Sequence, residues 1–310
     1  MAARWISVAP GRPVASVGPM ALEPRALLAG AALCAGAFML LLALAYGSSG
    51  ARSADASALQ GFLGLQRPRV TPITEAIGSI GNAFPVAVLA AILAAVAFAR
   101  GRPRVSLLVL LFVGLTSVSS QVLKALLAYP RDPVSGFGHI DPAAFPSGHA
   151  TASMTIAIAL VIVMPGRLRP LAAVVGVALA LGVSFSVVSM GWHFPSDVIG
   201  GYLLAAGWAL VLLAAVRATD LRFPERAGRS ALAQHSRATV DAVVGVGLVA
   251  TLMACLAAAA AALAVVVVFR LPDALDYVQD HPAFSLAFSL LSLSAVGLLS
   301  ALTLVLARRG

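Results

Sequence analysis

The sequence predicts an all-α membrane protein, a polytopic helical bundle of about eight transmembrane helices. The first observation behind this prediction is composition, since 60% of the 310 residues are hydrophobic and 11% are charged. A soluble domain usually has about a quarter of its residues charged. The second observation is that apolar runs recur along the chain, each near the roughly 20 residues needed to cross a bilayer, with short arginine clusters between them. The chain is therefore expected to be solvated by lipid over most of its length.

Residues 1–25 form a predicted cytoplasmic tail, and the first transmembrane span follows at 26–46. The tail contains glycine, proline and the basic residues Arg4, Arg12 and Arg25. Small residues after the apolar run leave open the alternative of a cleaved signal peptide. The length of the run and the extended tail before it favour an uncleaved span.

Five further spans complete a predicted six-span core over residues 26–216. The apolar runs place these spans at 83–99, 105–126, 147–164, 171–190 and 196–216. Before the second span, the polar and mixed stretch 47–82 is expected to contain a short interfacial helix at 71–82. A loop rich in proline, glycine and aspartate is expected at 128–145.

A basic cytoplasmic linker and two additional transmembrane helices are predicted after the core. The linker, 217–238, carries the arginines Arg217, Arg222, Arg226, Arg229 and Arg237. The two spans, at 240–268 and 284–306, form a C-terminal segment over 239–310. Between them, a loop at 270–283 carries Asp273, Asp276 and Asp280. Small residues in these spans allow close helix packing, so they could form a homodimer contact or a wall on the substrate side.

The distribution of basic residues predicts the orientation of the chain. An even number of spans places both termini on one side, and if that side is the cytoplasm, 15 of the 21 Lys and Arg residues lie inside. This orientation puts Lys124, the 128–147 loop and the 190–197 turn together on the extracytoplasmic face. A net charge of +9 would also suit a nucleic-acid partner. Because the charges lie in clusters between apolar runs, we expect membrane lipids and no nucleic acid as partners.

The tetrapeptide Pro146-Ser147-Gly148-His149 begins the predicted fourth span. Proline suits the first turn of a helix, and a serine side chain satisfies free backbone N–H groups there. A helix N-terminus followed by glycine offers backbone donors and a partial positive charge, a combination that favours phosphate. His149 is then placed to donate a proton. Taken alone, the same residues are also explained by a helix cap followed by a packed histidine.

A second histidine, His193, precedes the predicted sixth span, and Asp197 lies in the first turn of that span. Asp197 is expected to accept a hydrogen bond from His193 and so fix its tautomer. The other ring nitrogen would then be free to attack phosphorus. The alternative is that Asp197 is present only because a carboxylate is stabilised at a helix N-terminus.

Lys124 and Arg131 supply positive charge on the same face. Either side chain could simply extend to the membrane interface. Two cations near a helix N-terminus and two histidines instead indicate a phosphate site, since phosphoryl transfer depends mainly on positioning and charge neutralisation. None of the five histidines belongs to an H-E-x-x-H or cysteine-paired zinc motif, so we predict no metal and no cofactor.

Together these groups resemble the type 2 phosphatidic acid phosphatase family, lipid phosphatases that share a fold with vanadium haloperoxidases. The family pattern is Lys-x6-Arg-Pro, then Pro-Ser-Gly-His, then Ser-Arg-x5-His-x3-Asp. The resemblance covers roughly residues 50–215, and the matching positions are Lys124, Arg131, Pro146 to His149, Ser186, His193 and Asp197. The chain departs from the pattern at two positions, where Asp132 replaces proline and Val187 replaces arginine.

The resemblance implies an integral-membrane phosphatase that hydrolyses a lipid phosphate without a metal. By that resemblance His193 would be the nucleophile that forms a phosphohistidine, Asp197 would orient it, and His149 would protonate the leaving oxygen. The phosphate oxygens would be held by Lys124, Arg131, Ser147 and the Gly148 N–H. Substrates of bacterial relatives include polyprenyl diphosphates, phosphatidate and phosphatidylglycerol phosphate.

Val187 leaves three alternatives open. Arg67 or Arg69 could supply the missing cation, or the substrate could be less charged, such as a phosphodiester or a sugar phosphate. In the third alternative, activity is lost and the scaffold is kept for lipid binding or transport. Because the nucleophile, the acid and the orienting carboxylate are all present, hydrolysis is the leading hypothesis.

Overall fold

The computed structural model describes residues 23–130, 140–222 and 273–307, and these residues form an all-helical bundle without a β-strand. The all-α prediction is therefore confirmed. The helices are α1 (Pro24–Gly47), α2 (Ser49–Leu63), α3 (Thr71–Ser79), α4 (Ala83–Ala99), α5 (Pro103–Leu126), α6 (Gly148–Val163), the 3₁₀ turn η1 (Gly166–Leu168), α7 (Arg169–Ser189), α8 (Pro195–Arg222) and α10 (Pro282–Ala307).

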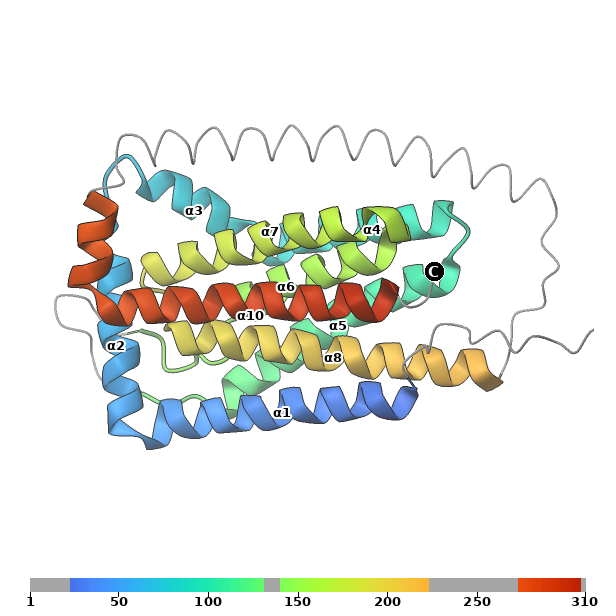
Figure 1. Cartoon of the computed structure of the whole chain (residues 1–310), viewed down its shortest axis with the longest axis horizontal. Coiled ribbons are helices and arrows are strands. Elements are labelled where there is room, and N and C mark those ends of the chain that lie inside the picture. The colour runs from blue at the N-terminus through green and yellow to red at the C-terminus, as the bar shows by residue number, and fades with distance from the viewer. Residues whose placement is uncertain (1–22, 131–139, 223–272, 308–310) are drawn as a thin grey trace, which may run out of the picture.

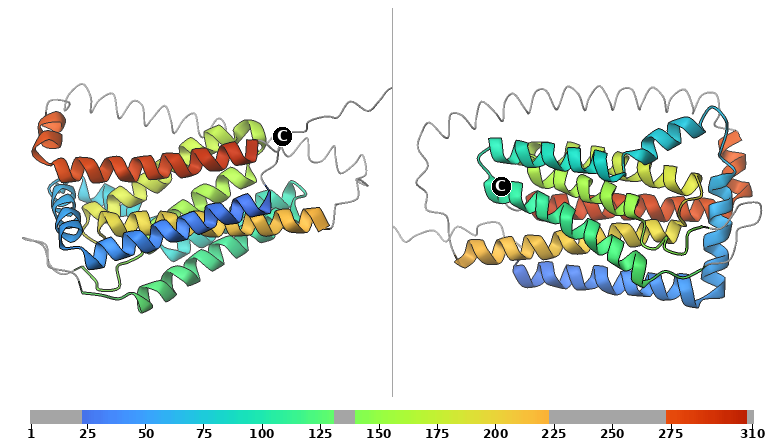
Figure 2. Two further views of the ribbon diagram at one scale, coloured as in Figure 1. Left: turned by 60° about the horizontal axis from the view of Figure 1, so that its bottom comes forward. Right: turned by 180° about the vertical axis from the view of Figure 1, so that it is seen from behind.

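The long helices run side by side along one axis, and α2 lies across one end of the bundle (Figures 1 and 2). Helix α6 lies at the centre, where it contacts α4, α5, α7, α8 and α10. Twelve of its 16 residues are buried. A central helix is shielded from lipid by its neighbours, which explains why α6 is shorter than the roughly 20 residues of a lipid-exposed span.

Helices occupy each predicted span that falls within the described residues. Among the described residues, five helices are long and apolar enough to cross a membrane, namely α1, α5, α7 together with η1, α8 and α10. Helices α3 and α4 are bent by 52° at the break between them and would together form a sixth span. The predicted span at 240–268 lies outside the described residues, so the total of eight stays a prediction.

Two segments expected to be irregular are helical. The stretch after the first span was expected to be helical only at 71–82, but α2 occupies Ser49–Leu63, and α3 ends at Ser79. Ser48 caps α2 by accepting a hydrogen bond from the Ala51 N–H (3.3 Å). The apolar side chains Leu59 and Phe62 of α2 are fully buried against the bundle. This packing stabilises a helix whose sequence is too weakly hydrophobic to have been predicted as one.

The acidic loop expected at 270–283 is the second correction, because residues 273–280 are helical. The Tyr277 hydroxyl donates a hydrogen bond to the Gly61 carbonyl of α2. Next along the chain, Phe284 of α10 packs against Phe62 with ring centroids 4.7 Å apart. These contacts dock the described part of the C-terminal segment onto the same bundle.

Arginines gather at the bundle end opposite α2 and bind helix C-termini there. The Arg100 guanidinium donates to the Val163 carbonyl at the end of α6, and Arg102 donates to the same oxygen (3.1 Å). Arg169 donates to the Leu306 carbonyl of α10 (2.6 Å). Positive charge is favourable at a helix C-terminus, so these clusters have a packing role as well as the topological role that their sequence pattern indicates.

The close crossing of α6 and α8 depends on Gly201. A Cβ at this position would lie 2.8 Å from the Ser147 carbonyl oxygen and 2.9 Å from the Thr151 backbone nitrogen. We expect Gly201→Ala to lower the free energy of unfolding by about 1–3 kcal/mol, because backbone atoms cannot yield as a flexible side chain can. The measurement is thermal unfolding in detergent. Gly114→Ala is the matched control, since a Cβ at Gly114 meets no atom within 4 Å, and equal melting temperatures for both variants would contradict the prediction.

Candidate active site

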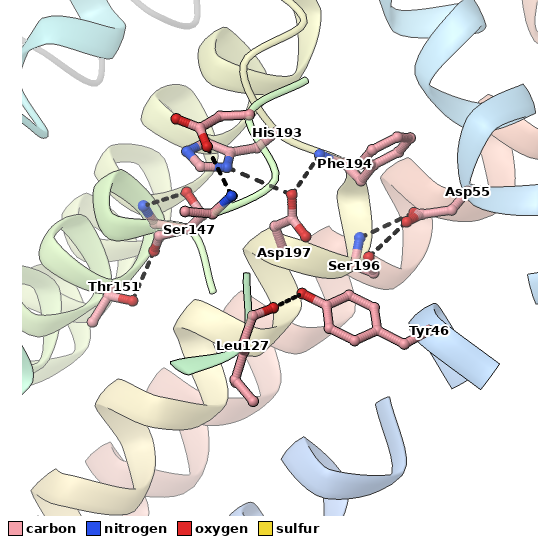
Figure 3. Close-up of polar contacts among 12 residues, drawn as sticks. Tyr46, Asp55, Leu127, Ser147, Thr151, His193, Phe194, Ser196 and Asp197 are labelled. Atoms are coloured by element: carbon pink, nitrogen blue, oxygen red, sulfur yellow. Dashed lines mark hydrogen bonds and ion pairs between the residues drawn. The ribbon is translucent and has the colours of Figure 1, made fainter. Parts of the chain in front are cut away.

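The N-terminus of α6 has the serine cap that the sequence predicts, but Pro146 lies before the cap and outside the first turn, since α6 begins at Gly148. Ser147 is its N-cap, and the Ser147 side chain accepts a hydrogen bond from the Ala150 N–H (3.3 Å). The Ser147 N–H donates to the Asp197 carbonyl (2.9 Å), which ties the start of α6 to the start of α8 (Figure 3). The Pro146–His149 segment and the His193–Asp197 segment, far apart in the sequence, are therefore joined by a backbone hydrogen bond.

His193 and Asp197 face each other at the start of α8 (Figure 3). The His193 Nδ1 and Asp197 Oδ2 atoms are 3.5 Å apart, and both side chains are buried. The same Asp197 oxygen accepts a 2.9 Å hydrogen bond from the Phe194 N–H, which satisfies the helix end. Nδ1 has no hydrogen-bond partner of normal geometry among the described residues. The two side chains are thus in contact as expected, but without the expected hydrogen bond, and Asp197 also has the capping role given as its alternative.

His149 lies beside His193. The two ring centroids are 6.1 Å apart and the rings are inclined by 60°. The Nε2 atom of His149 is 3.0 Å from the Asn82 Oδ1 atom, which is a hydrogen-bond distance. The ring centroid of Trp192 is 5.5 Å from that of His149. His149, which lies on α6, is therefore contacted by groups from the turn before α4 and from the turn before α8.

Lys124 reaches the same place from the last turn of α5. A Cβ placed on Gly148 would lie 3.8 Å from both the Cε and Nζ atoms of Lys124, so the ammonium group lies against the first residue of α6. Lys124, Gly148 and His149 line a cavity of about 420 Å³ between α4, α5 and α6, and His193 is not among its lining residues. The structure thus brings together six of the seven predicted site residues. The seventh, Arg131, lies outside the described residues.

The sequence matches the profile of the PAP2 superfamily over residues 37–220, which is more than half of the chain. The chain belongs to the PAP2 superfamily. This confirms the family resemblance, and the matched region contains every predicted site residue. The chain is accordingly a multi-pass membrane protein of a family of lipid phosphatases.

Two curated proteins are similar to this PAP2 protein. Phosphatidylglycerophosphatase B of Bacillus subtilis is 28% identical over 173 residues, which cover 54% of this chain and 85% of that protein. An undecaprenyl-diphosphatase of Sulfolobus acidocaldarius is 30% identical over 121 residues, which cover 34% of this chain and 56% of that protein. The chain thus spans most of the first relative and little more than half of the second.

The fold is also that of a solved structure, the crystal structure of a transmembrane PAP2 type phosphatidylglycerolphosphate phosphatase from Bacillus subtilis. The superposition has a TM-score of 0.50 at 24% sequence identity. It covers 66% of this chain and 99% of that one. This likeness supports the membrane-bundle fold of the PAP2 protein.

Val187 is fully buried in the last turn of α7 and packs against α3. A Cβ on Gly78 of α3 would lie 3.8 Å from the Val187 Cγ1 atom. Arg67, suggested as a replacement cation, is exposed, and its guanidinium donates to the carbonyl oxygens of Gly64 (2.8 Å) and Gln66 (2.7 Å) in its own loop. Arg69 is exposed as well. The structure therefore gives no support to either arginine as the replacement.

Sequence reasoning missed several residues that hold this site. Asp55 of α2 accepts hydrogen bonds from the Ser196 N–H (3.1 Å) and the Ser196 hydroxyl (2.6 Å), next to Asp197 (Figure 3). Asn82 contacts His149 and is the N-cap of α4, a position that its residue type favours and that could have signalled it. No sequence signal marks Asp55, because it is 141 residues away from its partner.

No group of three His, Cys, Asp or Glu side chains within 23–130, 140–222 and 273–307 is arranged to hold a metal ion. Independence from metal stays a prediction for the active protein.

Proposed function

We propose that this PAP2 protein hydrolyses a lipid phosphomonoester or diphosphate, such as phosphatidate or a polyprenyl diphosphate, at the extracytoplasmic membrane face through a phosphohistidine. The observation that carries the proposal is the gathering of two histidines, with ring centroids 6.1 Å apart, beside a lysine at a helix N-terminus. A helix N-terminus and a cation favour an anion, and paired imidazoles can supply a nucleophile and an acid.

In the first step, His193 would attack phosphorus through Nε2, because Nδ1 faces Asp197. The N–P bond forms as the P–O bond to the leaving oxygen breaks, and His149, protonated on both ring nitrogens, gives one of these protons to that oxygen and becomes neutral. Lys124, the Gly148 N–H and the Ser147 hydroxyl would neutralise the phosphate oxygens, with Arg131 expected to join them. Asp197 would stabilise the positive charge that the His193 ring acquires.

In the second step, water would attack phosphorus, with His149 now accepting a proton from the water. The N–P bond breaks, and inorganic phosphate leaves with His193 restored. The same histidine acts first as an acid and then as a base, because the first step must protonate the leaving oxygen and the second must remove a proton from water.

The distribution of charge supports the proposed extracytoplasmic location of the site. Arg100, Arg102 and Arg104 lie at the start of α5 and Lys124 lies in its last turn, so the site and the arginine cluster lie at opposite ends of this helix. The positive-inside rule assigns the arginine end to the cytoplasm. The proposed substrate class is supported by the two curated relatives, whose names both describe hydrolysis of a lipid phosphate or diphosphate.

The test is phosphate release by the purified protein in detergent, with phosphatidate, phosphatidylglycerol phosphate and a polyprenyl diphosphate offered separately. We expect turnover of at least one of these lipids and no effect of EDTA on the rate. Binding of all three without phosphate release would overturn the proposal.

A lipid-binding or transport protein on the same scaffold is the second candidate, and the buried Val187 favours it. We expect Val187→Arg to raise kcat/KM roughly tenfold or more, because a hydrogen bond to a charged group contributes about 1.5–3 kcal/mol. Val188→Arg is the matched control, since Val188 is equally buried in the same turn and should show no gain. A folded Val187→Arg protein that binds lipid but releases no phosphate would favour the binding protein.

A further inference from the structure

Ser120 of α5 is buried in an unusual state. Its side chain is only 2% exposed, and its hydroxyl oxygen has no hydrogen-bond partner among the described residues. A buried hydroxyl without a partner destabilises a folded protein, so such groups are rare and usually have a function.

Other hydroxyl side chains in these helices avoid this state by bonding to their own helix. Thr116 donates to the carbonyl four residues before it (2.8 Å), and Thr155 (2.7 Å) and Ser186 (2.8 Å) do the same. Ser120 makes no such bond in the described structure. Its hydroxyl is therefore available as a donor.

The Ser120 hydroxyl faces the proposed phosphate site. Ser120 lies one helical turn before Lys124, so the two side chains share a face of α5. A Cβ on Gly148 would lie 3.8 Å from the Ser120 oxygen and 3.8 Å from the Lys124 Nζ atom. Both residues line the 420 Å³ cavity that also contains His149.

We propose that Ser120 is an additional phosphate-binding residue, whose hydroxyl donates a hydrogen bond to a phosphate oxygen beside Lys124 and the Gly148 N–H. This inference rests on the proposed function. The phosphate oxygen is a charged acceptor, and such a bond is shorter and stronger than one between neutral groups. Substrate binding then satisfies a hydroxyl that no protein group among the described residues satisfies.

The test compares Ser120→Ala with Ser117→Ala, a matched control on the same helix that lines the same cavity but is exposed. The probes are inorganic phosphate and vanadate, measured as inhibitors of lipid phosphate release. We expect the inhibition constants to rise about tenfold or more in Ser120→Ala and to stay within about twofold in Ser117→Ala. The melting temperature of ligand-free Ser120→Ala should equal or exceed that of the wild type, whereas a packing role for the hydroxyl would lower it.

The outcomes separate this inference from the proposed function. If phosphate and vanadate inhibit Ser120→Ala with the same inhibition constants as the wild type, the Ser120 inference alone is overturned. Equal weakening in both serine variants would also overturn it, since the effect would then belong to the cavity as a whole. A wild-type protein that neither releases phosphate from lipid nor binds vanadate would overturn the proposed function and this inference with it.

Discussion

Replacing His193 is expected to lower the rate of lipid phosphate release by about 10³-fold or more, because removal of a nucleophile leaves only the binding and electrostatic contributions of a site. His193 is 5% exposed, so alanine would also leave a cavity in the structure. His193→Gln keeps most of the side-chain volume and should lose as much activity as His193→Ala. The measurement is turnover by purified protein, with melting temperature as the check on folding.

His281 provides the matched control for this prediction. It lies just before α10 and stacks on Tyr277 with ring centroids 4.0 Å apart, and among the described residues its ring is paired with neither site histidine. His281→Gln should keep its rate within about threefold of the wild type. Full activity in a folded His193→Gln protein would exclude the assigned nucleophile.

Replacing His149 is expected to give the second-largest loss, and its size should depend on the leaving group. General acid catalysis contributes about 10²–10⁴-fold. When the substrate is a phosphomonoester such as phosphatidate, the leaving lipid alkoxide needs the proton that His149 supplies, whereas the nitrophenolate of p-nitrophenyl phosphate leaves readily without one. His149→Ala should therefore lose about 10²-fold or more in the first turnover with the lipid, and much less in the first turnover with p-nitrophenyl phosphate.

The first turnover must be resolved by rapid mixing, because His149 is also the proposed base of the second step. A burst of nitrophenolate equal to the enzyme concentration, followed by slow steady-state turnover, is the expected trace for His149→Ala. An equal loss of the burst with both substrates would show that His149 positions the phosphate and does not protonate the leaving oxygen. His281→Gln again serves as the control, because it leaves the contact between His149 and Asn82 intact.

The parts of the site that were predicted from the sequence depend on contacts between residues close together in the sequence, at the N-terminus of a single helix. The serine cap of α6 and the pairing of His193 with Asp197 each join residues at most four positions apart. At this separation, residue type and spacing specify the geometry. The apolar runs likewise predicted the ends of the long helices to within six residues, the largest difference being at the C-terminus of α8, since lipid solvation requires a minimum length of apolar helix.

The parts that were missed depend on which helices are neighbours. Asp55 joins α2 to the start of α8, and Asn82 joins the turn before α4 to His149, 67 residues away. Helical periodicity shows which face is apolar but not which helix packs against it. Ser120 shows the same limit, because its spacing from Lys124 is visible in the sequence while the state of its hydroxyl is a property of the packed bundle.

Covalent attachment of phosphate to His193 is the central claim, and trapping the intermediate tests it most directly. His149→Ala protein mixed with p-nitrophenyl phosphate should accumulate it, because the second step lacks its base. Mass spectrometry at neutral or alkaline pH, where phosphohistidine survives, should then find one phosphoryl group on the peptide that contains His193. A phosphoryl group on another residue, or rapid turnover with no labelled enzyme, would contradict the account.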